Sequence, residues 1–172
     1  MPAATYDFIG AATLNDGTTD VISVTSIPST YTDLRVQLNI LSGAYPILRF
    51  NNDGSNIYYT VAYQSPSSDG GSIQATSNGP TTFMYANSNG TANTSYPSIY
   101  TYDVFNYTAS EFKMALINGT NDITSVSAGG IQSERWVGIW NNTTAVSSVY
   151  VYAASGTFAA GTNLQIYGIK KE

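Results

Sequence analysis

Apolar and polar residues alternate along much of the chain, and this alternation predicts β-strands with one buried face. The clearest stretch is LRVQLNI at residues 34–40, where every second residue is aliphatic and Arg35, Gln37 and Asn39 fall between. No window shows the 3.6-residue period of an amphipathic helix. The pattern predicts strands near Tyr6–Ala12, Val21–Ile27, Leu34–Leu41, Ile47–Asn51, Ile57–Gln64, Thr81–Ala86, Ile99–Asn106, Phe112–Asn118, Arg135–Trp140, Ala145–Ala153 and Leu164–Ile169.

Turn-forming residues separate the predicted strands. Asn15-Asp16-Gly17, Asn52-Asp53-Gly54 and Asn118-Gly119 predict tight hairpin turns, because Asn, Asp and Gly tolerate a positive φ. Two longer breaks, Ser65–Pro80 and Asn87–Pro97, exceed the usual loop of roughly 2–6 residues. Long loops on a rigid scaffold either carry contacts or simply cross through solvent, and both interpretations stay open.

Short strands of this number must stack or close to bury their apolar faces. A length of 172 residues suits one domain. We therefore predict an all-β fold, a single two-sheet antiparallel β-sandwich over residues 1–172, jelly-roll-like and with about ten strands. A closed barrel is the alternative.

The composition is poor in charge and rich in small neutral polar residues. Charged residues make up 10% of the chain, against about 25% in typical domains. Ser, Thr, Asn and Gly together account for 71 of 172 residues, and 14 are Tyr. The aromatic content excludes disorder. The net charge of −5 disfavours a nucleic-acid partner, and no apolar run approaches the roughly 18 residues of a membrane helix. No secretion signal is visible.

The chain contains no His and no Cys, which removes much chemistry. Nucleophiles that depend on a His base and zinc sites built on thiolate or imidazole are excluded. Carboxylates remain, and glycoside hydrolysis would need two of them ~5–9.5 Å apart. The acids inside or bordering predicted strands are Asp7, Asp33, Asp103, Glu111 and Glu134, but no spacing pairs them, and Asp103 falls on the solvated side of its strand. We therefore predict no catalytic residue and no cofactor.

Residues Asn51–Asn56 (NNDGSN) are rich in the oxygen ligands that calcium prefers. The segment has a single carboxylate and lacks the distal Glu of an EF-hand loop. A plain hairpin turn is therefore the favoured interpretation, and no metal site is predicted.

Aromatic residues are the clearest excess. They gather at Tyr58, Tyr59, Tyr63, Tyr85, Tyr96, Tyr100, Tyr102, Tyr107, Trp136, Trp140, Tyr150 and Tyr152. An exposed row would stack on sugar rings or anchor a protein interface, whereas the alternative is a sandwich core filled by aromatics. Trp136 and Trp140 share one side of their strand, with Gly138 leaving a gap between them for a packed group or a ligand. Core packing is the favoured interpretation.

Five short segments occur in an order that covers most of the chain. They are IPSTYTDL at 27–34, LRFNND at 48–53, NYTAS at 106–110, GIWN at 138–141 and LQIYGIKK at 164–171. In this combination the chain resembles small β-sandwich virion proteins of tailed bacteriophages, of the marine and cyanobacterial phage type: capsid decoration, head-fibre or tail-fibre proteins. The resemblance implies a structural role on the particle and carries over no catalytic residue.

On this resemblance we expect a non-enzymatic virion protein, made in the host cytoplasm without a signal peptide. It would act as a capsid decoration or cement protein that binds the outer head surface and reinforces it. Its expected partners are the major capsid protein and copies of itself, with a homotrimer favoured because such proteins usually follow three-fold sites. The alternative is a glycan- or receptor-binding adhesin at a fibre tip, with host-surface glycans as partner, and a glycosidase or lyase comes third. The sequence names no interface residue.

Overall fold

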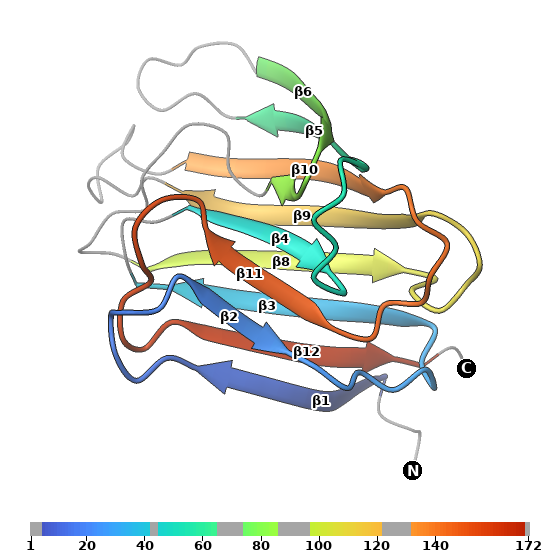
Figure 1. Cartoon of the computed structure of the whole chain (residues 1–172), viewed down its shortest axis with the longest axis horizontal. Helices are drawn as coiled ribbons and strands as arrows, with labels where there is room; N and C mark the ends of the chain where they lie inside the picture. The colour runs from blue at the N-terminus through green and yellow to red at the C-terminus, as the bar shows by residue number, and fades with distance from the viewer. Residues whose placement is uncertain (1–4, 42–44, 65–73, 86–96, 122–131, 171–172) are drawn as a thin grey trace.

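The computed structural model describes residues 5–41, 45–64, 74–85, 97–121 and 132–170, and in these ranges the chain forms two antiparallel sheets (Figure 1). The large sheet has the strand order β1-β12-β3-β8-β9-β10-β5-β6, and the small sheet has the order β2-β11-β4-β7. The strands are β1 Tyr6–Thr13, β2 Val21–Val24, β3 Asp33–Ile40, β4 Pro46–Phe50, β5 Tyr58–Gln64, β6 Gln74–Thr81, β7 Met84–Tyr85, β8 Ser98–Phe105, β9 Lys113–Asn121, β10 Gln132–Trp140, β11 Val149–Ala153 and β12 Asn163–Ile169.

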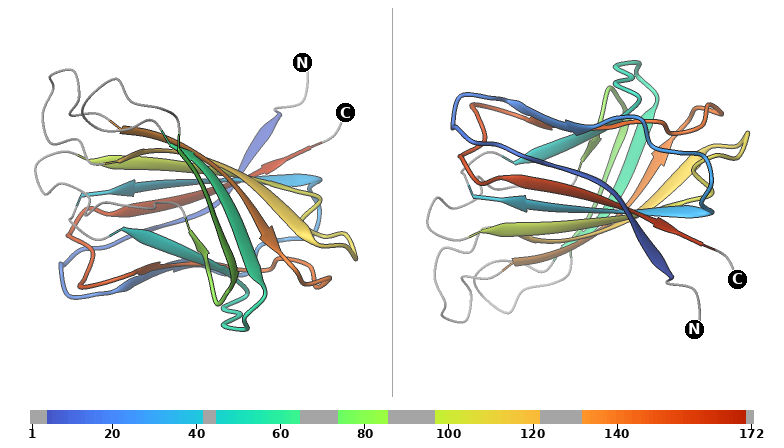
Figure 2. Two further views of the ribbon diagram at one scale, coloured as in Figure 1. Left: turned by 90° about the horizontal axis from the view of Figure 1, so that it is seen from above. Right: turned by 90° about the horizontal axis from the view of Figure 1, so that it is seen from below.

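The two sheets form two layers (Figure 2), and the large sheet twists so that β5 and β6 run steeply across the direction of β3. Both sheets have edge strands, β1 and β6 in one and β2 and β7 in the other. The predicted all-β, two-sheet antiparallel sandwich is therefore confirmed, and the barrel alternative is wrong. The described ranges hold no helix with the length and hydropathy needed to span a bilayer.

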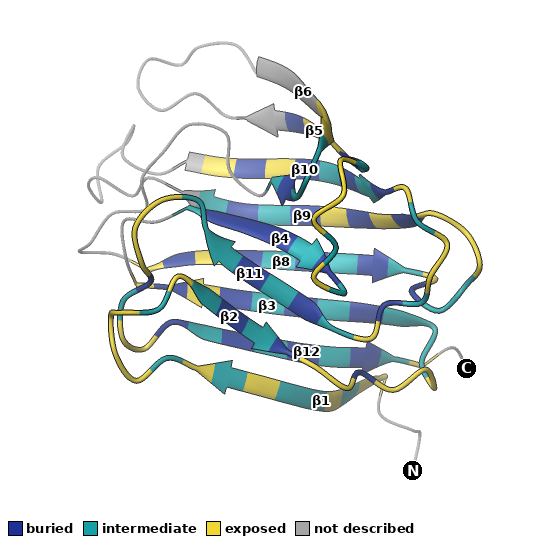
Figure 3. Cartoon of the chain, viewed as in Figure 1, coloured by how far each residue is buried: buried dark blue, intermediate teal, exposed yellow. Residues whose placement is uncertain are grey.

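One core lies between the facing sides of the sheets. The alternation predicted for residues 34–40 is confirmed, because Leu34, Val36 and Ile40 are 0% exposed. The small sheet contributes Phe50 and Val151 to the same cluster. Figure 3 shows the alternation of buried and less buried residues along the strands of the large sheet. Burial of these apolar side chains is the main term that holds the layers together.

Strand β6 falls inside the predicted loop Ser65–Pro80, so that part of the loop prediction is wrong. The sequence QATSNGPT has no apolar alternation, and the strand is an edge strand bonded only to β5, so backbone pairing rather than burial defines it. Because Thr81 belongs to β6, the predicted strand Thr81–Ala86 contracts to β7. Residues 65–73 and 87–96 of the two predicted loops lie outside the described residues.

The three predicted hairpin turns are wrong. The turns at 15–17 and 52–54 connect β1 to β2 and β4 to β5, and in each case the two strands belong to different sheets. The positive φ angles fall on Asn51 (53°) and Asn52 (54°). Asn118 and Gly119 lie within β9, where the Tyr100 ring of β8 lies over the glycine, and a Cβ at this position would be 2.5 Å from Cδ1 of that ring.

Backbone geometry shortens two other predicted strands. Val21–Ile27 ends three residues early, since Ser26 adopts a φ of 61°, which interrupts extended backbone. Ala145–Ala153 begins only at Val149, because the side chain of Asn51 hydrogen-bonds the backbone of the residues before it.

Candidate functional site

The face of the large sheet turned away from the small sheet carries a divided surface. Strand register places outward side chains in rows across the sheet, and one row runs Tyr167, Arg35, Asp103, Leu116 and Val137 over β12, β3, β8, β9 and β10. Side chains in the β12–β3–β8 part are mainly polar, and those in the β9–β10–β5 part are mainly apolar. We call the whole the outer face.

An apolar patch occupies the β9–β10–β5 part of the outer face. It consists of Tyr59, Val61, Met114, Leu116, Val137 and Ile139, which the register places side by side. Met114 is 46% exposed, Tyr59 and Val61 are 40% exposed, and Leu116 is 38% exposed. Contiguous exposed apolar side chains are typical of surfaces that contact another molecule.

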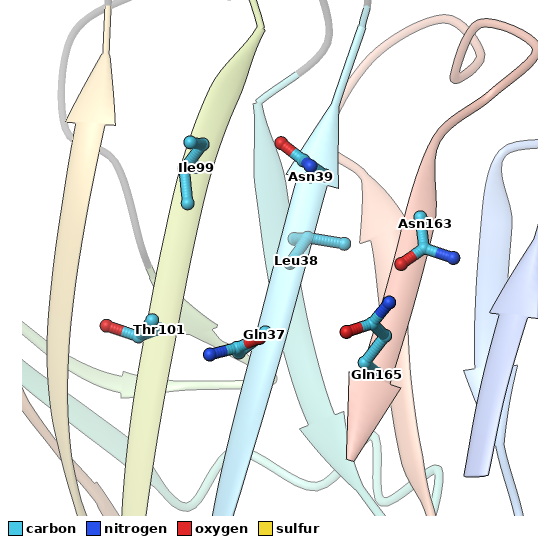
Figure 4. Close-up of a pocket in the computed structure, with 7 residues that line it drawn as sticks. All are labelled: Gln37, Leu38, Asn39, Ile99, Thr101, Asn163 and Gln165. Atoms are coloured by element: carbon cyan, nitrogen blue, oxygen red, sulfur yellow. The ribbon is translucent and has the colours of Figure 1, made fainter.

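A group of neutral polar side chains occupies the β12–β3–β8 part. This amide panel consists of Gln37, Asn39, Thr101, Asn163 and Gln165. Together with Leu38 and the exposed Ile99, these residues line a depression of about 150 Å³ (Figure 4). The register pairs Gln37 with both Gln165 and Thr101, and it pairs Asn39 with Asn163. The panel therefore presents amide and hydroxyl groups from three neighbouring strands in one shallow surface.

An ion pair lies within the β12–β3–β8 part. Arg35 Nε donates to Asp103 Oδ1 at 2.6 Å, and Nη2 donates to Oδ2 at 2.9 Å, a bidentate arrangement that fixes both side chains. The hydrogen bonding to Asp103 raises the pKa of Arg35. The guanidinium also lies over the Tyr6 ring, 5.2 Å from its centroid. Together with Gln37 and Tyr167, Tyr6 and Arg35 line a second depression of about 180 Å³.

Among the carboxylates considered for catalysis, Asp103, Glu111 and Glu134 do not come together in the structure. Asp103 lies on the outer face as predicted, but it is paired with Arg35 rather than simply solvated. Glu134 is 2% exposed on the inner side of β10, where it accepts a hydrogen bond from Trp136 Nε1 at 3.1 Å. Glu111 is exposed in the loop before β9. Asp103 and Glu134 therefore lie on opposite faces of one sheet and cannot flank a common substrate.

The oxygen-rich segment Asn51–Asn56 is held by the protein itself. Asp53 Oδ2 accepts from Trp140 Nε1 at 3.0 Å and from Asn142 Nδ2 at 3.1 Å, and Oδ1 accepts from the backbone of Ser55. Burial alone would raise the pKa of Asp53, but these hydrogen bonds outweigh it and hold the pKa below its ordinary value. In the described part of the chain, no three acidic side chains gather as a metal site.

The core interpretation of the two tryptophans is confirmed. Trp136 is 0% exposed and Trp140 is 1% exposed, and both face the interior. The gap that Gly138 leaves between them is filled by the side chain of Met84 from the small sheet. The close approach of the two sheets at this point therefore needs a glycine.

The tyrosines divide between the core and the surface. Tyr58, Tyr100, Tyr102 and Tyr107 are buried, whereas Tyr59 belongs to the apolar patch. On the small sheet, Tyr150 and Tyr152 stack with centroids 6.4 Å apart, and Arg49 lies over Tyr152 at 5.0 Å, so a cation already occupies that ring. The side chains of Tyr63 and Tyr96 lie outside the described residues.

The sequence contained part of the signal for the outer face. Arg35, Gln37 and Asn39 fall between buried residues of β3, and Leu116 falls between buried residues of β9. The sequence does not show that β3 pairs with β12 on one side and with β8 on the other, because these three strands are far apart along the chain. The register between the strands brings these scattered outward residues together as the apolar patch and the amide panel.

Comparisons with known proteins assign the chain to no family. No family model matches the chain, and no curated protein matches it. Solved structures that align with it include a functionally unknown protein from Saccharomyces cerevisiae, with 8% identity, a TM-score of 0.23, and coverage of 90% of this chain and 88% of that one. The Lotus tetragonolobus seed lectin has the same identity and TM-score, with coverage of 100% and 96%. Lectin I from Ulex europaeus in complex with the methyl glycoside of α-L-fucose also has 8% identity and a TM-score of 0.23, with coverage of 96% and 92%. Likeness at this TM-score carries no argument.

Proposed function

We propose that the protein is a non-enzymatic virion structural protein of a tailed bacteriophage, a decoration or cement subunit that binds the outer surface of the head. The observation that carries the proposal is the exposed apolar patch across β9, β10 and β5. Burying it against the major capsid protein would add interface area between neighbouring coat subunits and resist their separation. The phage context comes from the resemblance of the sequence segments described above.

The low charge content of the chain favours docking against a protein surface, because neutral groups avoid the desolvation cost of burying unpaired ions.

Three of the four sheet edges are unfavourable for pairing with another copy of the chain. The edge strand β1 has an irregular register between Phe8 and Gly10, β7 has two residues, and β6 contains Pro80. Each of these features makes strand addition less favourable. We expect a homotrimer in solution, and light scattering after size exclusion measures it. A mass three times 18.3 kDa supports the assembly, and a monomer mass argues against it.

Immunogold electron microscopy of intact particles tests the location. The antibody is raised against the purified chain, and the particles come from the phage that encodes it. Gold over the heads supports decoration. Gold confined to the tail would reject head binding, and absence of gold from every particle would reject a virion role.

Reinforcement is tested separately by heating heads that lack the protein, with and without added protein. The expected result is a higher temperature of DNA release after addition. The Leu116→Lys variant, which places a charge in the apolar patch, should give no such increase. Val21→Lys, on the outer side of the small sheet, is the matched control and should protect as the wild type does. Equal protection by both variants would reject the patch as the contact.

A further inference from the structure

The amide panel is a separate surface with its own chemistry. Its depression and the one lined by Tyr6 and Tyr167 share Gln37, so together they follow β3 along its outer side. Figure 4 shows the panel residues on three adjacent strands, with Gln37 between Thr101 and Gln165. The two depressions form one shallow, extended track, a shape that suits a chain-like ligand rather than a compact one.

Much of the hydrogen-bonding capacity of the panel is unused by the protein. Gln37, Asn39 and Thr101 make no side-chain hydrogen bond to another described residue. Two other members are held in place: Asn163 Nδ2 donates to Thr13 Oγ1 at 2.7 Å, and Gln165 Oε1 accepts from the Tyr167 hydroxyl at 2.8 Å. These bonds leave Asn163 Oδ1 as an acceptor and Gln165 Nε2 as a donor. The panel therefore combines two side chains that are held in place, Asn163 and Gln165, with three whose hydrogen-bonding groups are available to a ligand.

The electrostatics of the track disfavour a charged ligand. Arg35 is engaged by both carboxylate oxygens of Asp103, so its cation is neutralised within the site. No residue of the amide panel itself is ionisable. A phosphate or carboxylate ligand would find no unpaired cation here, and the net charge of −5 repels polyanions further.

We propose that this track binds a neutral glycan chain, laid along β3 across the amide panel. Sugar hydroxyls both donate and accept, as do the amides and the hydroxyl that line the surface. The Tyr167 ring offers an apolar surface beside the polar groups, and sugar rings pack against aromatic rings of this kind; one face of the Tyr6 ring is covered by the Arg35 guanidinium. The site is shallow, so binding at a single copy is weak, with a Kd in roughly the millimolar range, and several copies on one particle raise the avidity. The proposal uses a part of the outer face separate from the apolar patch and does not rest on capsid binding.

A glycan array tests the proposal with the purified full chain. The array carries neutral oligosaccharides of hexose, deoxyhexose and N-acetylhexosamine beside sialylated and sulfated ones. The expected result is binding to neutral members only. Binding to none, or to acidic members as strongly as to neutral ones, overturns the proposal.

Variants locate the site on any neutral glycan found. Asn39→Ala and the double variant Gln37→Ala/Thr101→Val should weaken binding at least fivefold, measured by titration of the immobilised glycan. Asn141→Ala, an exposed Asn in the loop after β10, is the matched control and should bind as the wild type does. These side chains make no hydrogen bond within the described protein, so unchanged thermal unfolding is expected and checks the fold. Wild-type binding by the panel variants overturns the proposal, whatever the result of the capsid experiments.

Discussion

The two faces of the large sheet are made by alternate residues of the same strands, yet they differ in almost every property. On β3, Leu34 and Val36 are completely buried, whereas Arg35 and Gln37 between them reach the surface. The inner face holds the two layers together, and the outer face presents an apolar patch and an amide panel. Substitutions can therefore alter the stability of the fold and the proposed binding surfaces separately, because adjacent residues of one strand lie on opposite faces.

The largest expected effect is the loss of a large inner side chain. Trp136→Ala removes an indole that is 0% exposed and whose Nε1 donates a hydrogen bond to the buried Glu134 carboxylate. We expect the free energy of unfolding to fall by about 3–5 kcal/mol, measured by urea denaturation. Val137→Ala, one residue along β10 and on the outer face, should lower it by less than ~1 kcal/mol. Similar losses at the two positions would break the distinction between the faces.

A smaller loss in the free energy of unfolding is expected for a substitution at Gly138, on the inner face of β10. Alanine here would place a Cβ against the Met84 side chain from the small sheet, and overpacking of this kind costs about 1–3 kcal/mol. The double variant Gly138→Ala/Met84→Ala gives a check by double-mutant cycle. The two losses should add up to more than the loss in the double variant. Strict additivity would contradict the contact between the sheets.

Acid should weaken the junction between the sheets at Asp53. Its pKa is below the ordinary value, so its contribution to stability is present above pH ~4 and is lost as the pH falls through the folded-state pKa. The free energy of unfolding, measured from pH 6 to pH 2, should therefore fall less steeply in Asp53→Asn than in the wild type. Asp20→Asn, an exposed Asp before β2, is the control. Superimposable curves for the wild type and Asp53→Asn would contradict the assignment.

A small gain is expected at Tyr102, whose buried hydroxyl has no hydrogen-bond partner among the described residues. Tyr102→Phe should raise the free energy of unfolding by up to ~1 kcal/mol at neutral pH, because an unsatisfied polar atom leaves the core. Burial also raises the pKa of Tyr102, so wild-type stability falls as the pH rises above ~10, where the unfolded chain loses this proton. The variant should lose less stability over that range. A destabilised variant at neutral pH would show that the hydroxyl is bound.

The inner face was predictable from sequence, and the outer face was predictable only in part. The alternation at residues 34–40 predicts which side chains are buried, because the inward and outward sides of a strand can be read from that strand alone. It does not report which strands are neighbours, so neither the apolar patch nor the amide panel could be assembled from their residues. Strand β6 was missed because its residues show no apolar period, and the turn at 52–54 was misread because hairpins and crossovers between sheets use the same residue types.

The most direct test of the account is cosedimentation of the wild type, Leu116→Lys and Val21→Lys with purified phage heads. Thermal unfolding of the three proteins should nearly coincide, because neither side chain belongs to the core: Leu116 is 38% exposed, and Val21 is half-buried on the outer side of β2. The account predicts that the wild type and Val21→Lys pellet with the heads and that Leu116→Lys remains in the supernatant. Cosedimentation of Leu116→Lys at the wild-type level would contradict the claim that the outer face binds the particle.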